Sequence, residues 1–156
     1  MMNTRGTREV MEFALKLNNL KSVVHVSTTY SNVFVHKTEE KIYPAAADWR
    51  KTIEICEKFE ADQLDVLTPL YINFMPNTYV FSKNLAEHVS DYYKSKLPVI
   101  VFRPSVVVGA VKDPLPGWVD NINGPMGILL ASVLGISKTM HIDPENRLDM
   151  IPVLNL

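Results

Sequence analysis

The chain has 156 residues, a formal net charge of −1 at pH 7 and an isoelectric point near 6.4. This length allows at most one domain, and the near-neutral charge argues against a nucleic-acid-binding protein, which needs a basic surface. The single cysteine, Cys56, excludes an internal disulfide and favours a reducing, intracellular compartment. The longest apolar stretch, residues 126–136, is far shorter than the roughly 20 residues that a membrane-spanning helix needs.

Apolar spacing, helix caps and turn residues predict a mixture of helices and strands. In chain order, the predicted elements are a helix over 3–18, a buried strand over 22–27, an irregular segment over 31–44, a helix over 48–67, a turn-rich connection over 68–77, a helix over 78–96, a strand over 98–102, a loop over 112–125, an apolar helix over 127–136 and a frayed end over 143–156. Two strands joined by a crossover that contains a helix form a βαβ unit, which implies a parallel sheet.

Two of the predicted helices carry a clear apolar face. Asp48 is the expected N-cap of the helix over 48–67. The residues that share one face in these two helices are Trp49, Ile53 and Cys56 in the first and Leu85, Val89 and Tyr92 in the second. We expect both faces to pack into the core and Cys56 to be buried there.

Tyr79 and Lys83 lie four residues apart in the predicted helix over 78–96, so their side chains share one face about one turn apart. A neighbouring ammonium favours the ionised form of a phenol, whose ordinary pKa is about 10. Such a pair can therefore act as a proton donor near a working pH. The alternative interpretation of this short pattern is structural, a half-buried tyrosine beside a solvated lysine.

Polar residues follow both predicted strands at the points where the strands end. Ser27 and Thr28 follow the first strand, and Arg103-Pro104-Ser105 follows the second. Open parallel sheets bind their ligands outside the carboxyl ends of the strands. We therefore expect these residues and the Tyr79 helix to converge on one site. A strand-end hydroxyl that bonds its own backbone is the structural alternative for Ser27 and Thr28.

These motifs together resemble those of the extended short-chain dehydrogenases/reductases. The loop over 112–125, which contains Pro-Gly-Trp and Asn-Gly-Pro, is similar to that of the alcohol-forming fatty acyl-CoA reductases, and the likeness extends from Asn3 to about Val153. The resemblance implies an α/β fold, a Rossmann-like doubly wound parallel sheet that is incomplete here. Residues 1–156 would form the central and C-terminal part of one NAD(P)-binding reductase domain.

The resemblance also implies catalytic roles. Tyr79 would donate the proton while a hydride from NADPH, the usual cofactor of the family, reaches an acyl carbonyl. Lys83 would assist Tyr79 and bind the nicotinamide ribose, which Tyr79 would also contact. Thr28, or Ser27 as second choice, would hold the substrate oxygen. The implied substrate is a long-chain acyl-CoA, reduced first to an aldehyde and then to a primary alcohol.

Two further groups of binding residues follow from the same resemblance. The cofactor would contact Asn3 and the turn of Arg103, Pro104 and Ser105. Alternatively, Asn3 is a helix cap and Arg103 pairs with a carboxylate. The residues expected to border the acyl site are Gly117, Trp118, Asn123, Gly124 and Pro125, although this loop could instead be a rigid surface turn. No pair of histidines has the spacing of a metal site, so we expect no metal.

The sequence departs from the family pattern at both ends. It contains no Gly-x-x-Gly-x-x-Gly turn, which holds the pyrophosphate in dinucleotide-binding folds, and Leu154 follows Pro152-Val153 where the family has aspartate. We therefore interpret the chain as a fragment with little activity of its own. Membrane association, at peroxisomes or the endoplasmic reticulum, is expected for the full-length protein only. The alternatives are a reductase of hydroxysteroids or sugar nucleotides and a non-catalytic truncated chain.

Overall fold

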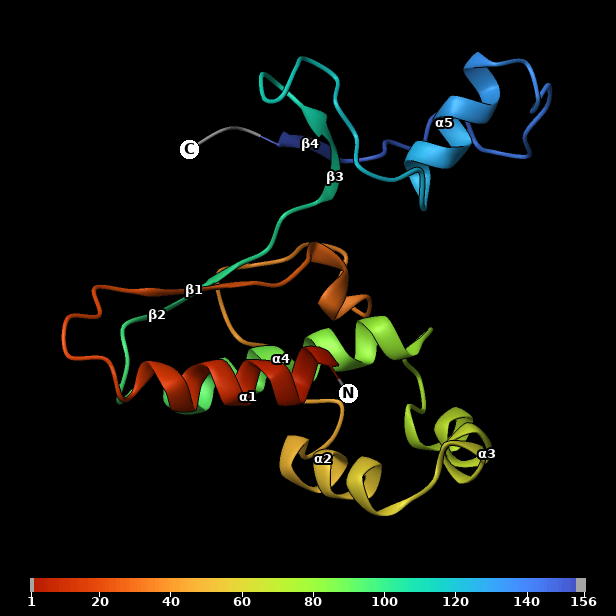
Figure 1. Cartoon of the computed structure of the whole chain (residues 1–156). Helices are drawn as coiled ribbons and strands as arrows, with labels where there is room; N and C mark the ends of the chain where they lie inside the picture. Colours follow the sequence, from red (N-terminus) through yellow and green to blue (C-terminus); the bar gives the residue numbers. More distant parts are fainter. Residues whose placement is uncertain (1, 154–156) are drawn as a thin grey trace. The chain divides into compact units, whose positions relative to one another are not determined.

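The computed structural model describes residues 2–153, and the chain divides into two compact units, Met1–Arg103 and Pro104–Leu156 (Figure 1). The elements of the first unit are α1 (Met2–Ala14), β1 (Val23–Val26), the 3-10 helix η1 (Thr29–Asn32), α2 (Trp49–Lys58), α3 (Ala61–Tyr71), α4 (Thr78–Tyr93) and β2 (Val99–Phe102). Those of the second unit are β3 (Val106–Ala110), α5 (Pro125–Val133) and β4 (Met150–Val153). The departure noted at Leu154 lies outside the described residues.

The first unit is a βαβ arrangement, as the sequence predicts. β1 pairs with β2 in parallel, with Val23 opposite Val99 and Val26 opposite Phe102. Helices α1 and α4 run side by side along one face of this sheet (Figure 1), where Val23 and Val99 pack against the core. The residues that alternate with them, Val24 and Ile100 among them, are exposed on the other face. Among the described residues of the first unit, helices therefore cover one face of this sheet.

The core of the first unit lies between α1, α2 and α4. Its largest fully buried apolar side chains are Met11 and Leu85, and Val89 is also inaccessible to solvent. Asp48 caps α2 as predicted, because its carboxylate accepts hydrogen bonds from the backbone N–H groups of Arg50 and Lys51.

The helix predicted over 48–67 is wrong in one respect, because it is two helices. α2 ends at Lys58, and α3 begins after Glu60, whose backbone N–H donates to Gln63 Oε1 in a capping arrangement. Apolar residues recur at helical spacing on both sides of the break, so the sequence pattern does not reveal it. Pro69, predicted in a turn, lies inside α3, which ends two residues later at Tyr71.

Two predicted core residues are also misplaced. Tyr93 rather than Tyr92 continues the apolar stripe of α4, and its hydroxyl donates a short hydrogen bond to Glu12 of α1. Tyr92 is 46% exposed and stacks against the Arg50 guanidinium instead. Cys56 is only partly buried, because it faces a cavity between α2 and α3 instead of the core.

The second unit contains two strands that the sequence analysis does not predict. β3 pairs with β4 in parallel, with Val106 opposite Met150. Of the end predicted as frayed, residues 150–153 therefore form a strand, and residues 154–156 lie outside the described part. Two prolines conceal these strands in the sequence: Pro104 predicts that strand structure ends there, and Pro152 predicts that residues 150–153 are not a strand. A proline is nevertheless tolerated in a strand where its missing N–H is not needed for pairing.

The loop between β3 and α5 depends on glycine at two positions. Gly117 and Gly124 have φ angles of +83° and +63°, which glycine adopts without the strain that other residues meet. Gly124 immediately precedes α5, whose first residue is Pro125.

The fold is thus a mixed α/β structure with two short parallel sheets, neither of them closed, in agreement with the α/β class that the sequence predicts. Among residues 2–153, no helix combines the length and the apolar character that crossing a membrane requires.

Candidate active site

Three polar residues of α4 form one row that runs from solvent into the core. Tyr79, Lys83 and Glu87 are spaced four residues apart, so they share a helix face. Asn77 fixes the start of the helix, because its side chain accepts a hydrogen bond from Val80 N at 2.9 Å. Tyr79 is 50% exposed, whereas Glu87 is 1% exposed. The row thus places a reachable phenol two turns above a buried carboxylate.

Lys83 connects this row to the end of β1. Its ammonium donates a hydrogen bond of 3.1 Å to the Val26 carbonyl, the last residue of the strand. An ammonium has three hydrogens, so two remain for a ligand after this bond. The structure therefore confirms that the Tyr79 helix and the end of β1 converge, as the sequence predicts.

The two hydroxyls at the end of β1 have different surroundings. Ser27 Oγ donates to Glu87 Oε1 at 2.5 Å, so its proton is already engaged. Thr28 is the N-cap of η1, and its Oγ1 accepts a bond of 3.3 Å from Tyr30 N. Within residues 2–153 the Thr28 hydroxyl proton has no acceptor. Of the two candidates, Thr28 is the one whose hydroxyl proton is not already engaged, and its contact with a substrate oxygen stays a prediction.

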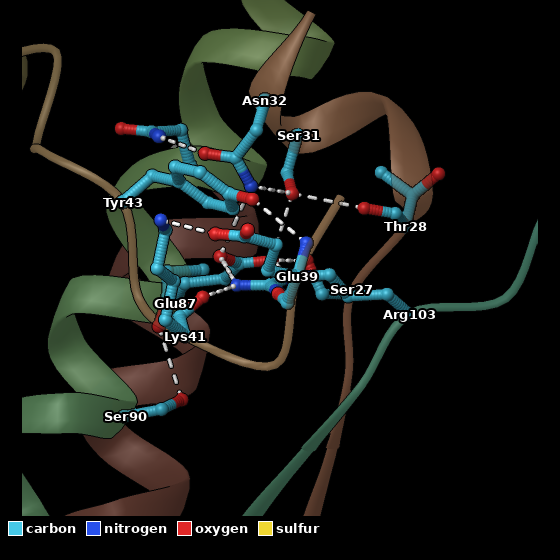
Figure 2. A network of polar contacts seen from close by, with 12 residues as sticks. Ser27, Thr28, Ser31, Asn32, Glu39, Lys41, Tyr43, Glu87, Ser90 and Arg103 are labelled. Carbon is cyan, nitrogen blue, oxygen red and sulfur yellow. Dashed lines mark hydrogen bonds and ion pairs between the residues drawn. The ribbon is translucent and has the colours of Figure 1, made fainter. Parts of the chain in front are cut away.

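Glu87 is the centre of a buried polar network that the sequence analysis misses (Figure 2). Arg103 binds it through one edge of its guanidinium, where Nε donates to Oε1 and Nη2 donates to Oε2, each at 2.8 Å. Ser31 Oγ lies 2.7 Å from Glu87 Oε1 and 2.9 Å from the Thr28 carbonyl oxygen. Burial by itself raises the pKa of Glu87, but the hydrogen bonds from Arg103, Ser27 and Ser31 outweigh it and hold the pKa below its ordinary value.

Arg103 extends the network to the segment after η1. Its Nη1 donates to the Glu39 carbonyl at 3.2 Å and its Nη2 to the Lys41 carbonyl at 2.9 Å. The hydrogen bond to Glu87 raises the pKa of Arg103, so the guanidinium stays charged. The structure thus agrees with the alternative in which Arg103 pairs with a carboxylate. A cofactor contact through its backbone stays a prediction.

Asn3 lies near the row but not as a helix cap. It belongs to the first turn of α1, and its Nδ2 donates to Ser82 Oγ at 3.0 Å, next to Lys83. The neighbouring Thr4 is fully buried and donates to the Ser82 carbonyl at 3.1 Å, which holds the two helices together. Asn3 is therefore close to the Tyr79–Lys83 pair, and its contact with a cofactor stays a prediction.

The predicted binding residues after Arg103 all belong to the second unit. Within that unit, Trp118 and Asn123 line a cavity of about 680 Å³, and Trp118 Nε1 donates to Asp120 Oδ1 at 2.7 Å. The remaining predicted residues do not line this cavity; they are Pro104, Ser105, Gly117, Gly124 and Pro125. Their contacts with a cofactor or an acyl chain stay predictions.

An apolar cavity adjoins Tyr79 in the first unit. Its volume is about 750 Å³, and its walls come from α2, α3 and the first turns of α1 and α4. A second cavity, of about 590 Å³, is lined by charged residues that include Lys41, Lys94 and Arg103. The site therefore has an apolar space at the Tyr79 end and a charged one beside Arg103.

Comparison with known proteins identifies the family. An NAD-binding family described as Male sterility protein matches residues 1–154. The chain belongs to this family. It is 41% identical over 152 residues to a Drosophila melanogaster protein provisionally named fatty acyl-CoA reductase CG8306. It is 40% identical to fatty acyl-CoA reductase 1 of Xenopus laevis and 37% identical to that of Rattus norvegicus, each over 152 residues.

These matches cover 97% of this chain but 30% of each of the three relatives. The chain thus spans about a third of the length of the curated relatives it matches. The resemblance inferred from Tyr79, Lys83 and the loop after β3 is confirmed at the level of the family, and with it a nicotinamide cofactor.

Proposed function

We propose that this chain carries the proton-donating centre of an NADPH-dependent, alcohol-forming fatty acyl-CoA reductase. The observation that carries the proposal is the Lys83 ammonium bound at the end of β1, with the exposed Tyr79 phenol one turn away on the same helix. The names of the relatives support the substrate class. We also propose that the complete domain has a doubly wound parallel sheet.

The donors at this site fit a nicotinamide ribose. Ribose hydroxyls need partners that donate and accept hydrogen bonds, which the Tyr79 phenol and the two remaining Lys83 hydrogens provide. When bound, the reduced nicotinamide supplies the hydride. The charge that then develops on the carbonyl oxygen is stabilised by a hydrogen bond from Thr28 and removed by a proton from Tyr79. Lys83, one turn away, offsets the negative charge left on Tyr79.

Two reductions account for an alcohol product. The first gives a hemithioacetal, which expels the CoA thiol and leaves an aldehyde at the same site. Tyr79, reprotonated from solvent, then donates to the aldehyde oxygen in the second reduction. Because residues 1–156 contain no glycine-rich phosphate turn, we expect little turnover from this chain alone. Membrane association, at peroxisomes or the endoplasmic reticulum, is proposed for the longer protein.

The function is tested with a reductase of the relatives' length that contains these residues. Incubation with palmitoyl-CoA and either NADPH or NADH is followed by gas chromatography of the lipid products. We expect hexadecanol, formed faster with NADPH. If palmitoyl-CoA is left intact while a hydroxysteroid or a sugar nucleotide is turned over, the substrate class proposed here is wrong and another short-chain dehydrogenase activity replaces it.

A further inference from the structure

The cavity beside Tyr79 has an apolar floor and a polar rim. The floor is formed by α2, α3 and the residue that follows α2. Its apolar side chains are Ile55, Cys56, Phe59, Leu64, Leu67 and Tyr71, and Thr52 and Thr68 also line it. The rim contains Asn3, Thr78, Tyr79 and Ser82 at the first turns of α1 and α4. Its volume, about 750 Å³, lies within the range of about 300–1,000 Å³ that is usual for small-molecule sites.

Several apolar side chains around the cavity stay partly exposed, Phe59 and Leu67 among them, although Tyr71 packs against Phe81 and the core. α3 buries none of its residues, although it carries Leu64, Leu67 and Tyr71 toward the cavity. α2 buries Trp49 and Ile53 in the core on its other side. Apolar walls of this kind gain free energy when an apolar group displaces water from them. The cavity therefore suits an apolar ligand.

The charged side chains that line each cavity indicate which part of a ligand could bind there. Among residues 2–153, no Asp, Glu, Lys, Arg or His lines it. By contrast, the cavity beside Arg103 is lined by Glu39, Glu40, Lys41, Asp91 and Lys94 in addition to Arg103. A ligand with a long alkyl chain and a polar head would thus place its alkyl chain in the first cavity and keep its charged groups out of it.

Tyr79 fixes the end at which such a ligand would enter. Of the four proposed catalytic residues, Tyr79 lines the cavity, whereas Lys83, Thr28 and Ser27 do not. A thioester carbonyl held at the Tyr79 phenol has its alkyl chain attached directly to it. The cavity is therefore within reach of the first carbons of that chain.

We propose that the cavity between α2, α3 and α4 binds the alkyl chain of the acyl substrate, and that Leu64 and Leu67 contribute to chain-length preference. This inference rests on the proposed reductase function. Burying one methylene group corresponds to about a fourfold gain in affinity. The affinity should therefore rise steeply with acyl length until the cavity is filled.

Cys56 provides a direct test, because it is the single cysteine of the chain and lies in the cavity floor. The alkylation of Cys56 by iodoacetamide is followed by mass spectrometry on the 156-residue chain. Palmitoyl-CoA, below its micelle concentration, should slow this reaction at least fivefold, whereas butyryl-CoA and free CoA analogues without a thiol should leave it unchanged. Equal rates with and without palmitoyl-CoA would overturn the proposal.

A pair of variants on α3 separates cavity filling from a general effect on the helix. Leu67→Trp should fill the cavity and abolish the protection by palmitoyl-CoA. The matched control Val66→Trp changes a neighbour that is 76% exposed and does not line the cavity, so protection should persist. If both variants behave alike, the cavity is not the binding site.

These measurements involve no turnover, so they are independent of the test of the reductase function. Hexadecanol formation without protection of Cys56 would refute the cavity and leave the proposed function intact. Protection of Cys56 without hexadecanol formation would support an alkyl-binding cavity and refute the reductase activity.

Discussion

Removing the charge of Glu87 should strongly destabilise the first unit. Glu87→Gln keeps the shape of the side chain but leaves the Arg103 guanidinium, which is 12% exposed, without its counter-charge. Removing one partner of a buried ion pair lowers the free energy of unfolding by about 3–5 kcal/mol. Typical domains are stable by only about 5–15 kcal/mol, so this is a large share of the total.

The free energy of unfolding is measured by urea titration of the 156-residue chain and the variant. The matched control is Glu57→Gln, which breaks the exposed ion pair between Glu57 and Arg5 and should cost at most about 1 kcal/mol. The double variant Glu87→Leu/Arg103→Met removes both charges and should recover part of the loss, because the buried Ser27 and Ser31 hydroxyls then lack their acceptor. A loss for Glu87→Gln no larger than that for Glu57→Gln would refute the reasoning.

Three further expectations concern pH and helix capping. The pKa of Glu87 is lowered in the folded state, because its hydrogen bonds outweigh the effect of burial. Its contribution to the free energy of unfolding should therefore be present above about pH 4.3 and be lost as the pH falls below that value. The difference between urea midpoints at pH 7 and pH 3 should accordingly be smaller in Glu87→Gln than in the unaltered chain. Burial and the hydrogen bond to Glu12 raise the pKa of Tyr93 to about 12, so one tyrosine should ionise late in an absorbance titration at alkaline pH, and stability should decline between roughly pH 10 and 12. Asp48→Ala should lower the free energy of unfolding by about 1 kcal/mol through the loss of the α2 cap, as measured by urea titration.

Local sequence patterns are sufficient to predict those parts of the candidate site that lie on a single helix or strand. The four-residue spacing of Tyr79 and Lys83 is visible in the sequence, and the hydroxyls after the first strand mark its carboxyl end. The βαβ rule then brings the two together, as the Lys83 bond to Val26 shows. These features depend on residues close in sequence or on a general rule of topology.

The Glu87 network could not be predicted in the same way. Ser27 and Glu87 are 60 positions apart, and their contact depends on how α4 packs against the end of β1. The signal available in the sequence was the position of Glu87, four residues after Lys83 on the same helix face. A charged residue at this place is usually assigned to solvent, and only the three-dimensional structure shows Arg103 opposite it.

The most direct test of the central claim is the rate of hexadecanol formation from palmitoyl-CoA by a full-length reductase containing these residues, compared with its Tyr79→Phe variant. We predict a loss of about 10²–10⁴-fold, because the variant keeps the ring but lacks the proton to donate. Tyr92→Phe, on the same helix and 46% exposed, serves as the control and should retain activity. Tyr79→Phe that forms hexadecanol at the unaltered rate would contradict the assignment of Tyr79 as the proton donor.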